Sequence, residues 1–414
     1  MSDTEPTETV EEFRLRARDW LAANMPKKKA VERATGGSDE GDWLRARELQ
    51  KILHSGGFAG LHFPKEYGGQ GLPVEYQQAF TEESIGYEMP LSLNVPSLSI
   101  CAPVLLTHGT EEQKREFLPK VISGEIILCQ FLSEPSGGSN LAGVLTRADR
   151  DGDSWVINGS KIWSTSAYAA DYALCLTRSD WDAPKHRGLT MFLVKVHQPG
   201  VDLRRITMVN GSDEFCQEFF DDLVIPDSMR VGEVNDGWTI ASTQLFYERQ
   251  AVGGGSPYVS GVGVGIGGGF RPTTTLSEVA RHLGVDQEPW AKDLIAKNRI
   301  AHTVHHELVG HVGAQVAEKK LPGVALSLIR LAHAEANWAE YDAGLEISGA
   351  AGVSHSDEFI DGQWAKNYLS RQGSALGGGS TEMARNIISE RVLQMPREAA
   401  PDKDIPFREV RQGR

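Results

Sequence analysis

The 414-residue chain has few cysteines, few basic clusters and no long apolar run of the membrane type. Its net charge of −14 argues against a nucleic-acid surface, because phosphate binding needs clustered basic side chains. The first residues are acidic and polar, so we expect no signal peptide. The few cysteines lie far apart without a CxxC pair, which indicates reduced, buried thiols in a cytoplasmic protein: Cys101, Cys129, Cys175 and Cys216.

One stretch, residues 251–270, carries no charge over 20 residues. Nine of them are glycine, and one proline and two serines interrupt the rest, so the segment has too little apolar area to span a bilayer. The apolar fraction of 40% and the charged fraction of 24% are those of a globular protein. The length is enough for two or three domains.

The pattern of apolar residues changes twice along the chain, which predicts three domains at 1–125, 126–235 and 236–414. In the first, capping boxes at Thr9 and Thr110 begin two helices. Helical spacing predicts three more over 43–54, 75–87 and 93–107.

The second domain is predicted to be a β domain, because short β-branched and aromatic runs alternate with turn dipeptides. Asp151-Gly152 and Asn158-Gly159 predict a short strand, 155–157, between two tight turns. Further strands are expected over 172–176, 189–196, 201–208 and 216–224. In the third domain, helical periodicity begins near Gly237 and continues over 290–318, 324–348, 361–369 and 380–393, which predicts a four-helix bundle. The fold class is therefore α+β.

Two segments of the middle domain indicate a flavin site. Residues 133–140 read Ser-Glu-Pro-Ser-Gly-Gly-Ser-Asn, and residues 158–165 read Asn-Gly-Ser-Lys-Ile-Trp-Ser-Thr. A hydroxyl beside a Pro-Gly-rich turn offers hydrogen-bonding groups to a planar heterocycle, and a Trp near a Thr offers an apolar face with one hydrogen bond. Either segment alone would be typical of an ordinary turn.

In their order and spacing, these segments resemble the flavin signatures of the acyl-CoA dehydrogenase family. Residues 379–393 and the following Pro-Arg-Glu at 396–398 resemble its closing motif. The resemblance implies an N-terminal helical domain, a middle β-barrel and a C-terminal helical bundle, with FAD as cofactor. It also implies that a carboxylate removes the α-proton of an acyl-CoA thioester while the β-hydrogen leaves as hydride, giving a trans-2-enoyl-CoA. An electron-transfer flavoprotein would be the acceptor.

The family's commonest base is a Glu just ahead of the final helix, and that position holds Gly378 here. A second subgroup, which includes isovaleryl-CoA and long-chain enzymes, carries its base in a Glu-Arg pair on an early helix of the C-terminal domain. Residues 245–249, Leu-Phe-Tyr-Glu-Arg, match that placement. We therefore expect Glu248 to be the base, with a pKa raised by apolar neighbours, against the alternative of an exposed helix Glu in an ordinary ion pair. Gly378 keeps an N–H for the thioester carbonyl.

The resemblance also assigns the flavin contacts. Leu132 and Ser133 would meet the isoalloxazine ring, Trp163 would cover one face and Thr165 would bond near N5. Arg249 would be the buried Arg beside the base, close to the cofactor. Ser139 is expected to lie near the pantetheine or phosphate region of CoA.

One departure concerns assembly. Family homo-oligomers carry an Arg-x-Phe-Gly motif, followed by a Gln, that reaches the flavin of a neighbouring subunit, and residues 253–315 contain none. In lacking this motif, the chain resembles the actinobacterial subgroup in which two unlike subunits form a heterotetramer that acts on steroid side-chain CoA thioesters. A homo-oligomer is the other possibility. Gly-rich residues 253–255 would leave room for a bulky or branched acyl group.

Several alternatives stay open. An acyl-CoA oxidase would share these residues and admit oxygen, a flavin monooxygenase of this fold would not need Glu248, and a non-catalytic assembly subunit would use it structurally. Residues 263–268 satisfy GxGxxG, but no buried strand precedes them, so a loop is favoured over a Rossmann site. The cluster His302, His305, His306 and His311 lacks the spacing of a zinc motif and is expected to be solvated or interfacial; no metal is predicted.

Overall fold

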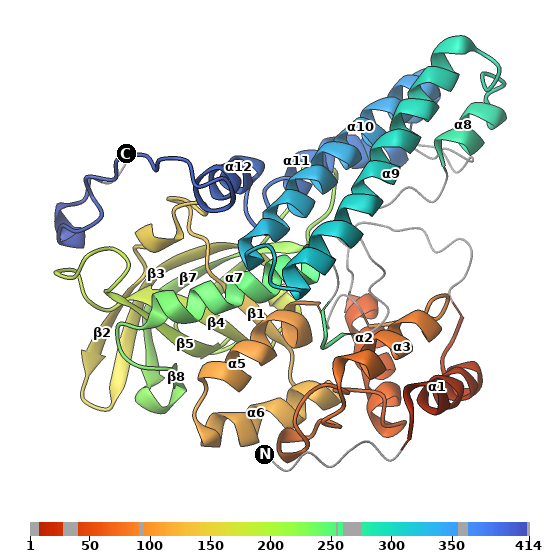
Figure 1. The fold of residues 1–414 in the computed structure, drawn as a ribbon. Helices are drawn as coiled ribbons and strands as arrows, with labels where there is room; N and C mark the ends of the chain where they lie inside the picture. Colours follow the sequence, from red (N-terminus) through yellow and green to blue (C-terminus); the bar gives the residue numbers. More distant parts are fainter. Residues whose placement is uncertain are drawn as a thin grey trace.

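The computed structural model describes residues 8–27, 40–90, 95–253, 256–259, 275–354 and 363–411. Helices come first, a sheet occupies the middle, and helices return (Figure 1). The first helical unit contains α1 (Val10–Asn24), α2 (Glu40–Ser55), α3 (Val74–Glu83), the π-helix η2 (Val95–Cys101), α5 (Ala102–His108) and α6 (Glu111–Ser123). Capping boxes at Thr9 and Thr110 are confirmed, since each hydroxyl accepts the N3 N–H while the N3 side chain bonds back to the cap.

Two predicted N-terminal helices have different ends. The helix expected over 75–87 stops at Glu83, and Gly86 then takes a left-handed φ of 95°. The helix expected over 93–107 is divided into η2 and α5, with Pro96 inside the first and Pro103 in the first turn of the second. Proline lacks the N–H of a regular helical hydrogen bond, so the wider π turn accommodates the first of them.

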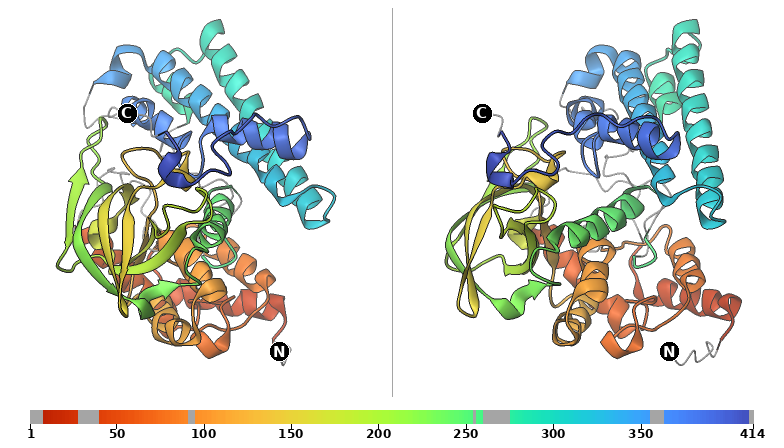
Figure 2. Two further views of the ribbon diagram at one scale, coloured as in Figure 1. Left: turned by 90° about the vertical axis from the view of Figure 1, so that its left-hand side faces the viewer. Right: turned by 60° about the vertical axis from the view of Figure 1, so that its left-hand side comes forward.

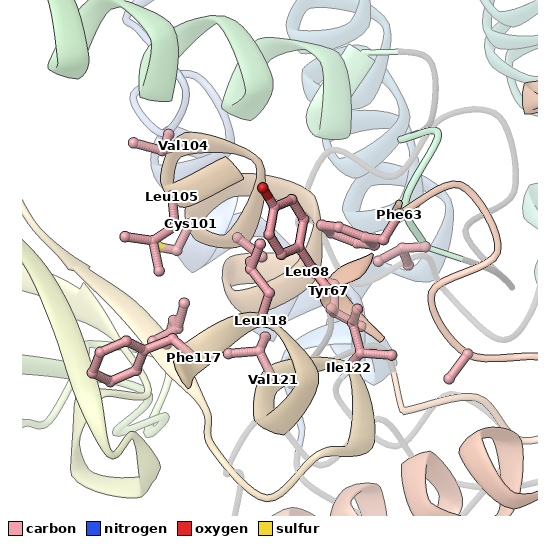
Figure 3. Close-up of a cluster of buried hydrophobic side chains, with 14 of the residues drawn as sticks. Phe63, Tyr67, Leu98, Cys101, Val104, Leu105, Phe117, Leu118, Val121 and Ile122 are labelled. Carbon is pink, nitrogen blue, oxygen red and sulfur yellow. The ribbon is translucent and has the colours of Figure 1, made fainter. Parts of the chain in front are cut away.

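The core of this unit is a continuous group of buried apolar side chains (Figure 3). Phe63 and Leu98 meet Leu118 and Ile122 from α6, and the same group extends to Leu174 in the sheet. The helical unit and the sheet therefore share buried apolar surface, which holds them in one orientation.

The middle unit is an eight-stranded sheet in the order β6-β7-β3-β2-β4-β5-β8, with β1 paired to β4. Its strands are β1 (Leu128–Phe131), β2 (Arg147–Asp151), β3 (Ser154–Thr165), β4 (Tyr172–Arg178), β5 (Leu189–Lys195), β6 (Val201–Ile206), β7 (Phe215–Pro226) and β8 (Arg230–Val231). All four cysteines are buried and free.

The prediction of a tight turn at Asn158-Gly159 is wrong. Strand β3 runs straight through this dipeptide and pairs with β7 over its length, with a register shift between Ile157 and Gly159. Gly159 has φ 144°, and the Asn158 amide exchanges hydrogen bonds with Asp222 across the shift at 3.0 and 2.8 Å. A β-bulge therefore uses the residues that a hairpin would have used.

The C-terminal unit is built around α10 (Leu326–Val353), which packs against five other α-helices. These are α7 (Gly237–Gly253), α8 (Leu276–His282), α9 (Pro289–Ala317), α11 (Gln363–Ser374) and α12 (Thr381–Ile387), which continues as the π-helix η7 (Ile388–Val392). Helices α9 and α10 form a long pair that projects away from the sheet, while α7 lies along the sheet (Figures 1 and 2).

The last residues return from the helices to the sheet. Phe407 is buried beneath the Arg178 guanidinium, 3.4 Å from the ring centroid, and Asp402 pairs with Lys185 at 2.8 Å. This strap fastens the C-terminal helices to the middle unit. None of the helices in the described part of the chain has the length and apolar character that a membrane crossing needs.

Candidate active site

The side chain of Glu248 lies in the middle of α7 and meets groups from two other elements. The Gln130 side-chain amide, at the third position of β1, donates to Glu248 Oε2 at 3.4 Å. The backbone N–H of Gly378, in the loop ahead of α12, also faces this carboxylate and lowers its pKa. Three segments far apart in sequence thus converge on one ionisable group.

Burial raises the pKa of the Glu248 carboxyl. The Gln130 hydrogen bond, the positive charge of Arg249, the Gly378 N–H and the positive charge of Arg330 all oppose that rise, and burial outweighs them. A carboxylate held this way is more basic than a solvated one yet is prepared for ionisation, which are the properties of a general base.

The loop that carries Gly378 is held by a buried arginine. Arg330 on α10 is 5% exposed, and its Nη2 donates to the carbonyl oxygen of Gly377 at 2.7 Å. Gly378 and Gly379 follow with φ of 72° and 98°, a left-handed conformation that favours glycine. This turn directs the N–H of Gly378 towards α7.

Arg249 is next to the base in sequence and is partly buried. Burial lowers the pKa of its guanidinium, the Glu248 carboxylate raises it, and the neighbouring Arg391 of η7 lowers it. The guanidinium therefore places positive charge between the base and the last helix.

The two segments of the expected flavin site lie side by side. The Ile162 N–H donates to the Ser133 carbonyl at 2.9 Å. Beneath them, the Lys161 ammonium bonds Glu134 Oε1 at 2.8 Å and the Leu132 carbonyl at 3.1 Å, and both side chains are almost fully buried. Although burial raises the pKa of Glu134, Lys161 and the Thr146 and Leu145 N–H groups outweigh it and lower that pKa. An internal ion pair therefore joins the two segments.

Trp163 is held outward by a second bulge of β3. The register with β7 shifts between Ile162 and Ser164, and Trp163 takes φ 67°, which is unusual for a residue with a Cβ. Its indole is 49% exposed and its edge packs on Phe215, with ring centroids 6.0 Å apart. A strained backbone that presents a large aromatic face beside the exposed Thr165 suits a planar heterocycle.

Next to Trp163 in sequence, Ser164 meets a second carboxyl group in the sheet interior. Glu218 on β7 is fully buried, and its Oε2 accepts the Ser164 hydroxyl hydrogen at 2.9 Å. Burial raises its pKa to about 8, so Glu218 carries a proton at neutral pH. The serine of the Trp163–Thr165 segment is thus anchored to a neutral acid.

The structure groups the expected residues into two sets. Glu248, Arg249 and Gly378 form one, and Leu132, Ser133, Trp163 and Thr165 form the other. Strand β1 links them, because Gln130 contacts the base and Leu132 follows two residues later, roughly 7 Å along an extended chain. Ser139 lies apart on the exposed turn that follows Glu134.

Sequence reasoning missed five residues that this geometry brings forward. Two of them, Glu134 and Lys161, lie inside the quoted segments, where the available signal was that each is the single charged residue of its segment. The others have no local pattern that marks them: Gln130, Glu218 and Arg330. Residues 254–255, which were expected to leave room for the acyl group, and the GxGxxG run 263–268 lie outside the described part of the chain.

The histidines of α9 are distributed differently from a metal site. His302 pairs with Glu340 at 3.1 Å, and His305 is buried with its ring centroid 5.2 Å from that of His333. His306 and His311 are exposed. Within the described residues, no group of three or more His, Cys, Asp or Glu side chains could hold a metal ion.

Three family profiles match the chain in sequence order. The acyl-CoA dehydrogenase N-terminal domain matches residues 7–125, the middle domain residues 129–223, and the C-terminal domain residues 235–393. Together these matches cover nearly the whole chain.

Individual relatives point to the same family. The acyl-CoA dehydrogenase IpdE1 of Mycobacterium tuberculosis is 33% identical over 94% of this chain and 99% of its own length. The acyl-CoA dehydrogenase FadE34 of the same organism is 31% identical over 86% of this chain and 47% of its own length.

Solved structures resemble the fold throughout. The steroid acyl-CoA dehydrogenase Tcur3481-Tcur3483 has a TM-score of 0.76 at 29% identity, covering 96% of this chain and 100% of the other. The ChsE4-ChsE5 complex from Mycobacterium tuberculosis has a TM-score of 0.72 at 25% identity, covering 95% of this chain and 100% of the other.

Proposed function

Because this chain belongs to the acyl-CoA dehydrogenase family of flavin-dependent oxidoreductases, we propose that Glu248 is the base with which it converts an acyl-CoA thioester into the trans-2-enoyl-CoA. The observation that carries the assignment is the convergence of the Gln130 amide and the Gly378 N–H on the half-buried Glu248 carboxylate. This carboxylate adjoins the loop where the family's other base would lie.

The proposed reaction breaks two C–H bonds and forms one C=C bond. The carboxylate of Glu248 removes the α-proton, and its raised pKa makes it a stronger base. Enolate charge then develops on the thioester oxygen, where the Gly378 N–H would donate as in an oxyanion hole. Bound FAD would supply the acceptor for the β-hydride. Its ring would rest against Trp163, Leu132, Ser133 and Thr165.

The Gly378 N–H faces the base itself. We expect the thioester carbonyl to take over this donor when the substrate binds. The exchange removes one interaction that stabilises the ionised carboxylate, so it increases the basicity of Glu248 when the α-proton is in place.

The substrate class proposed here is an acyl-CoA with a bulky, branched or steroid side-chain acyl group. One supporting observation is the similarity to a protein described as a steroid acyl-CoA dehydrogenase. The other is the base on α7 with glycine at 378, which removes a side chain from the loop beside the reacting carbons.

We propose that an electron-transfer flavoprotein receives the electrons and that a homologous second subunit completes the assembly. The absent Arg-x-Phe-Gly motif supports the second subunit, and so does the likeness to the ChsE4-ChsE5 complex. We place the enzyme in the cytoplasm. In this arrangement the chain supplies the base and the ring contacts, and the partner supplies the cross-subunit FAD contacts.

The test is co-expression with a homologous neighbouring-gene subunit. Bound FAD and ferrocenium reduction would be measured with straight-chain, branched and steroid side-chain acyl-CoAs. We expect turnover with bulky acyl groups, and in Glu248→Gln retained FAD with turnover lost. Turnover in Glu248→Gln would remove Glu248 from the mechanism. Stoichiometric hydrogen peroxide in place of ferrocenium reduction would identify an oxidase, and full FAD occupancy in the lone chain would contradict the heteromer.

A further inference from the structure

We propose that Arg330 is a positioning residue for this reaction, holding the Gly377–Gly379 turn so that the Gly378 N–H faces the reacting thioester. The inference rests on the proposed function, since it assigns a task within that site. It is carried by the bond from Arg330 Nη2 to the Gly377 carbonyl at 2.7 Å.

The turn needs an anchor from outside itself. Residues 377–379 are three consecutive glycines, and Gly378 and Gly379 have φ of 72° and 98°. Glycine has the greatest conformational freedom to lose and offers no side chain to fix the backbone. The Gly377 carbonyl and the Gly378 N–H belong to the same peptide group. An external donor that holds this carbonyl therefore controls the direction of the Gly378 N–H.

Arg330 is suited to that role. It lies near the start of α10, the helix that packs against both α7 and α12, and its side chain is 5% exposed. A hydrogen bond from a charged donor is stronger than a neutral one, and a buried donor is screened less by water. One side chain of the central helix, which itself packs against α7, thus holds the loop that carries the N–H.

The same guanidinium acts on the base through charge. Arg330 lowers the pKa of Glu248, against the rise caused by burial. Burial lowers the pKa of Arg330 itself, and Glu248 opposes that fall. Among the described residues, the other charged or titratable groups that interact with this carboxylate are Arg249 on its own helix and the Cys101 thiol of η2. Burial is the larger cause of the raised pKa of Cys101, and Glu248 raises it further. Arg391 lies beyond, next to Arg249. Loss of the Arg330 charge should therefore raise the pKa of Glu248.

The predicted consequence is a split between kcat and KM. A misdirected N–H stabilises the enolate less but leaves most substrate contacts in place, so the loss falls on kcat. For Arg330→Met, which keeps the stem and removes the guanidinium, we expect kcat to fall by about tenfold or more with a small change in KM. The acidic limb of the kcat profile should move to higher pH, because Glu248 must be ionised to act.

The experiment combines this kinetic analysis with amide hydrogen exchange of the segment 375–380 in the full chain. We expect faster exchange in Arg330→Met than in wild type. Arg330→Lys keeps the charge, so its pH limb should stay closer to wild type even if its shorter reach loosens the turn. Arg385→Met is the matched control, since Arg385 links α12 to Glu335 of α10 at 2.7 Å on the surface and should change neither readout.

The possible outcomes distinguish a failure of the positioning role of Arg330 from a failure of the proposed function. Unchanged exchange in Arg330→Met, or an equal response in Arg385→Met, would overturn the positioning role regardless of turnover. Faster exchange together with no turnover of any acyl-CoA by the wild-type assembly would instead overturn the proposed function. If Arg330→Met does not fold, Arg330→Lys decides the matter, because wild-type exchange and wild-type kcat in that variant would contradict a role for the directed guanidinium bond.

Discussion

The backbone N–H of Gly378 faces the carboxylate of Glu248 and favours its ionised form, so the turn ahead of the last helix meets α7 at the base. Glycine supplies only backbone at this position, and the ionisable group comes from a different helix. In the proposed reaction, the proton acceptor and the enolate donor are therefore two separate segments that Gln130 and Arg330 hold in place.

Replacing Gln130 by Leu should change the titration of the base. The amide of Gln130 lowers the pKa of Glu248, so its removal allows burial to raise that pKa further. The acidic limb of the kcat/KM profile should move to higher pH, with less effect at high pH, where Glu248 is ionised in both proteins. A profile that coincides with wild type would show that the 3.4 Å contact has no part in tuning the base.

A second prediction concerns the stability of the sheet domain. Glu218 has its pKa raised from 4.5 to about 8, so between these values the folded protein keeps a proton that the unfolded chain has lost. The free energy of unfolding should therefore fall as pH rises through this range, by about 1 kcal/mol per pH unit from this group alone.

Glu218→Gln keeps the shape and cannot ionise, so it should lack that slope. Denaturant unfolding of both proteins at several pH values between 5 and 8 measures the difference. Parallel pH dependence in the two proteins would mean that Glu218 is already ionised in the folded state.

The Lys161–Glu134 pair should be costly to break. Lys161→Met would leave the Glu134 carboxylate buried and without its ammonium partner, which costs about 3–5 kcal/mol in comparable sites. FAD content should fall too, because Lys161 also holds the Leu132 carbonyl.

The double variant Lys161→Met with Glu134→Gln should recover part of the stability, since no unpaired charge remains. Thermal and denaturant unfolding of wild type, both single variants and the double variant measure the coupling. Additive losses would contradict an ion pair that acts as one unit.

Trp163 provides the test of the ring contact. Trp163→Ala should weaken FAD binding by about tenfold, because it removes a large aromatic face, whereas Trp163→Phe should retain most of the affinity. Fluorescence titration of deflavinated protein with FAD, in the co-expressed assembly, measures both. Equal affinity in wild type and Trp163→Ala would place the ring elsewhere.

Much of the architecture can be predicted from local patterns. The capping boxes at Thr9 and Thr110 mark helix starts, and the long periodic runs of the C-terminal third correspond to α9 and α10. The Asn158-Gly159 prediction failed because a dipeptide that suits a hairpin also suits a β-bulge. Only the partner strand β7, distant in sequence, decides between them.

The site is less accessible to such reasoning. Glu248 and Gly378 are identified through a family resemblance, because no spacing in the sequence relates the two positions. Gln130 looks like an ordinary polar residue near the end of a short strand, and Arg330 like a helix arginine expected in solvent. Their contacts depend on how α10, β1 and the glycine turn pack together, which is a tertiary property.

The most direct test of the central claim is exchange of the substrate α-proton with solvent. The co-expressed assembly would be incubated without an electron acceptor in D₂O, with the acyl-CoA that reduces its flavin fastest, and deuterium at the α-carbon would be measured by mass spectrometry. We predict deuterium incorporation by wild type and by the Arg385→Met control, and none above background by Glu248→Gln with retained FAD. Wild-type incorporation by Glu248→Gln would contradict the assignment of Glu248 as the base.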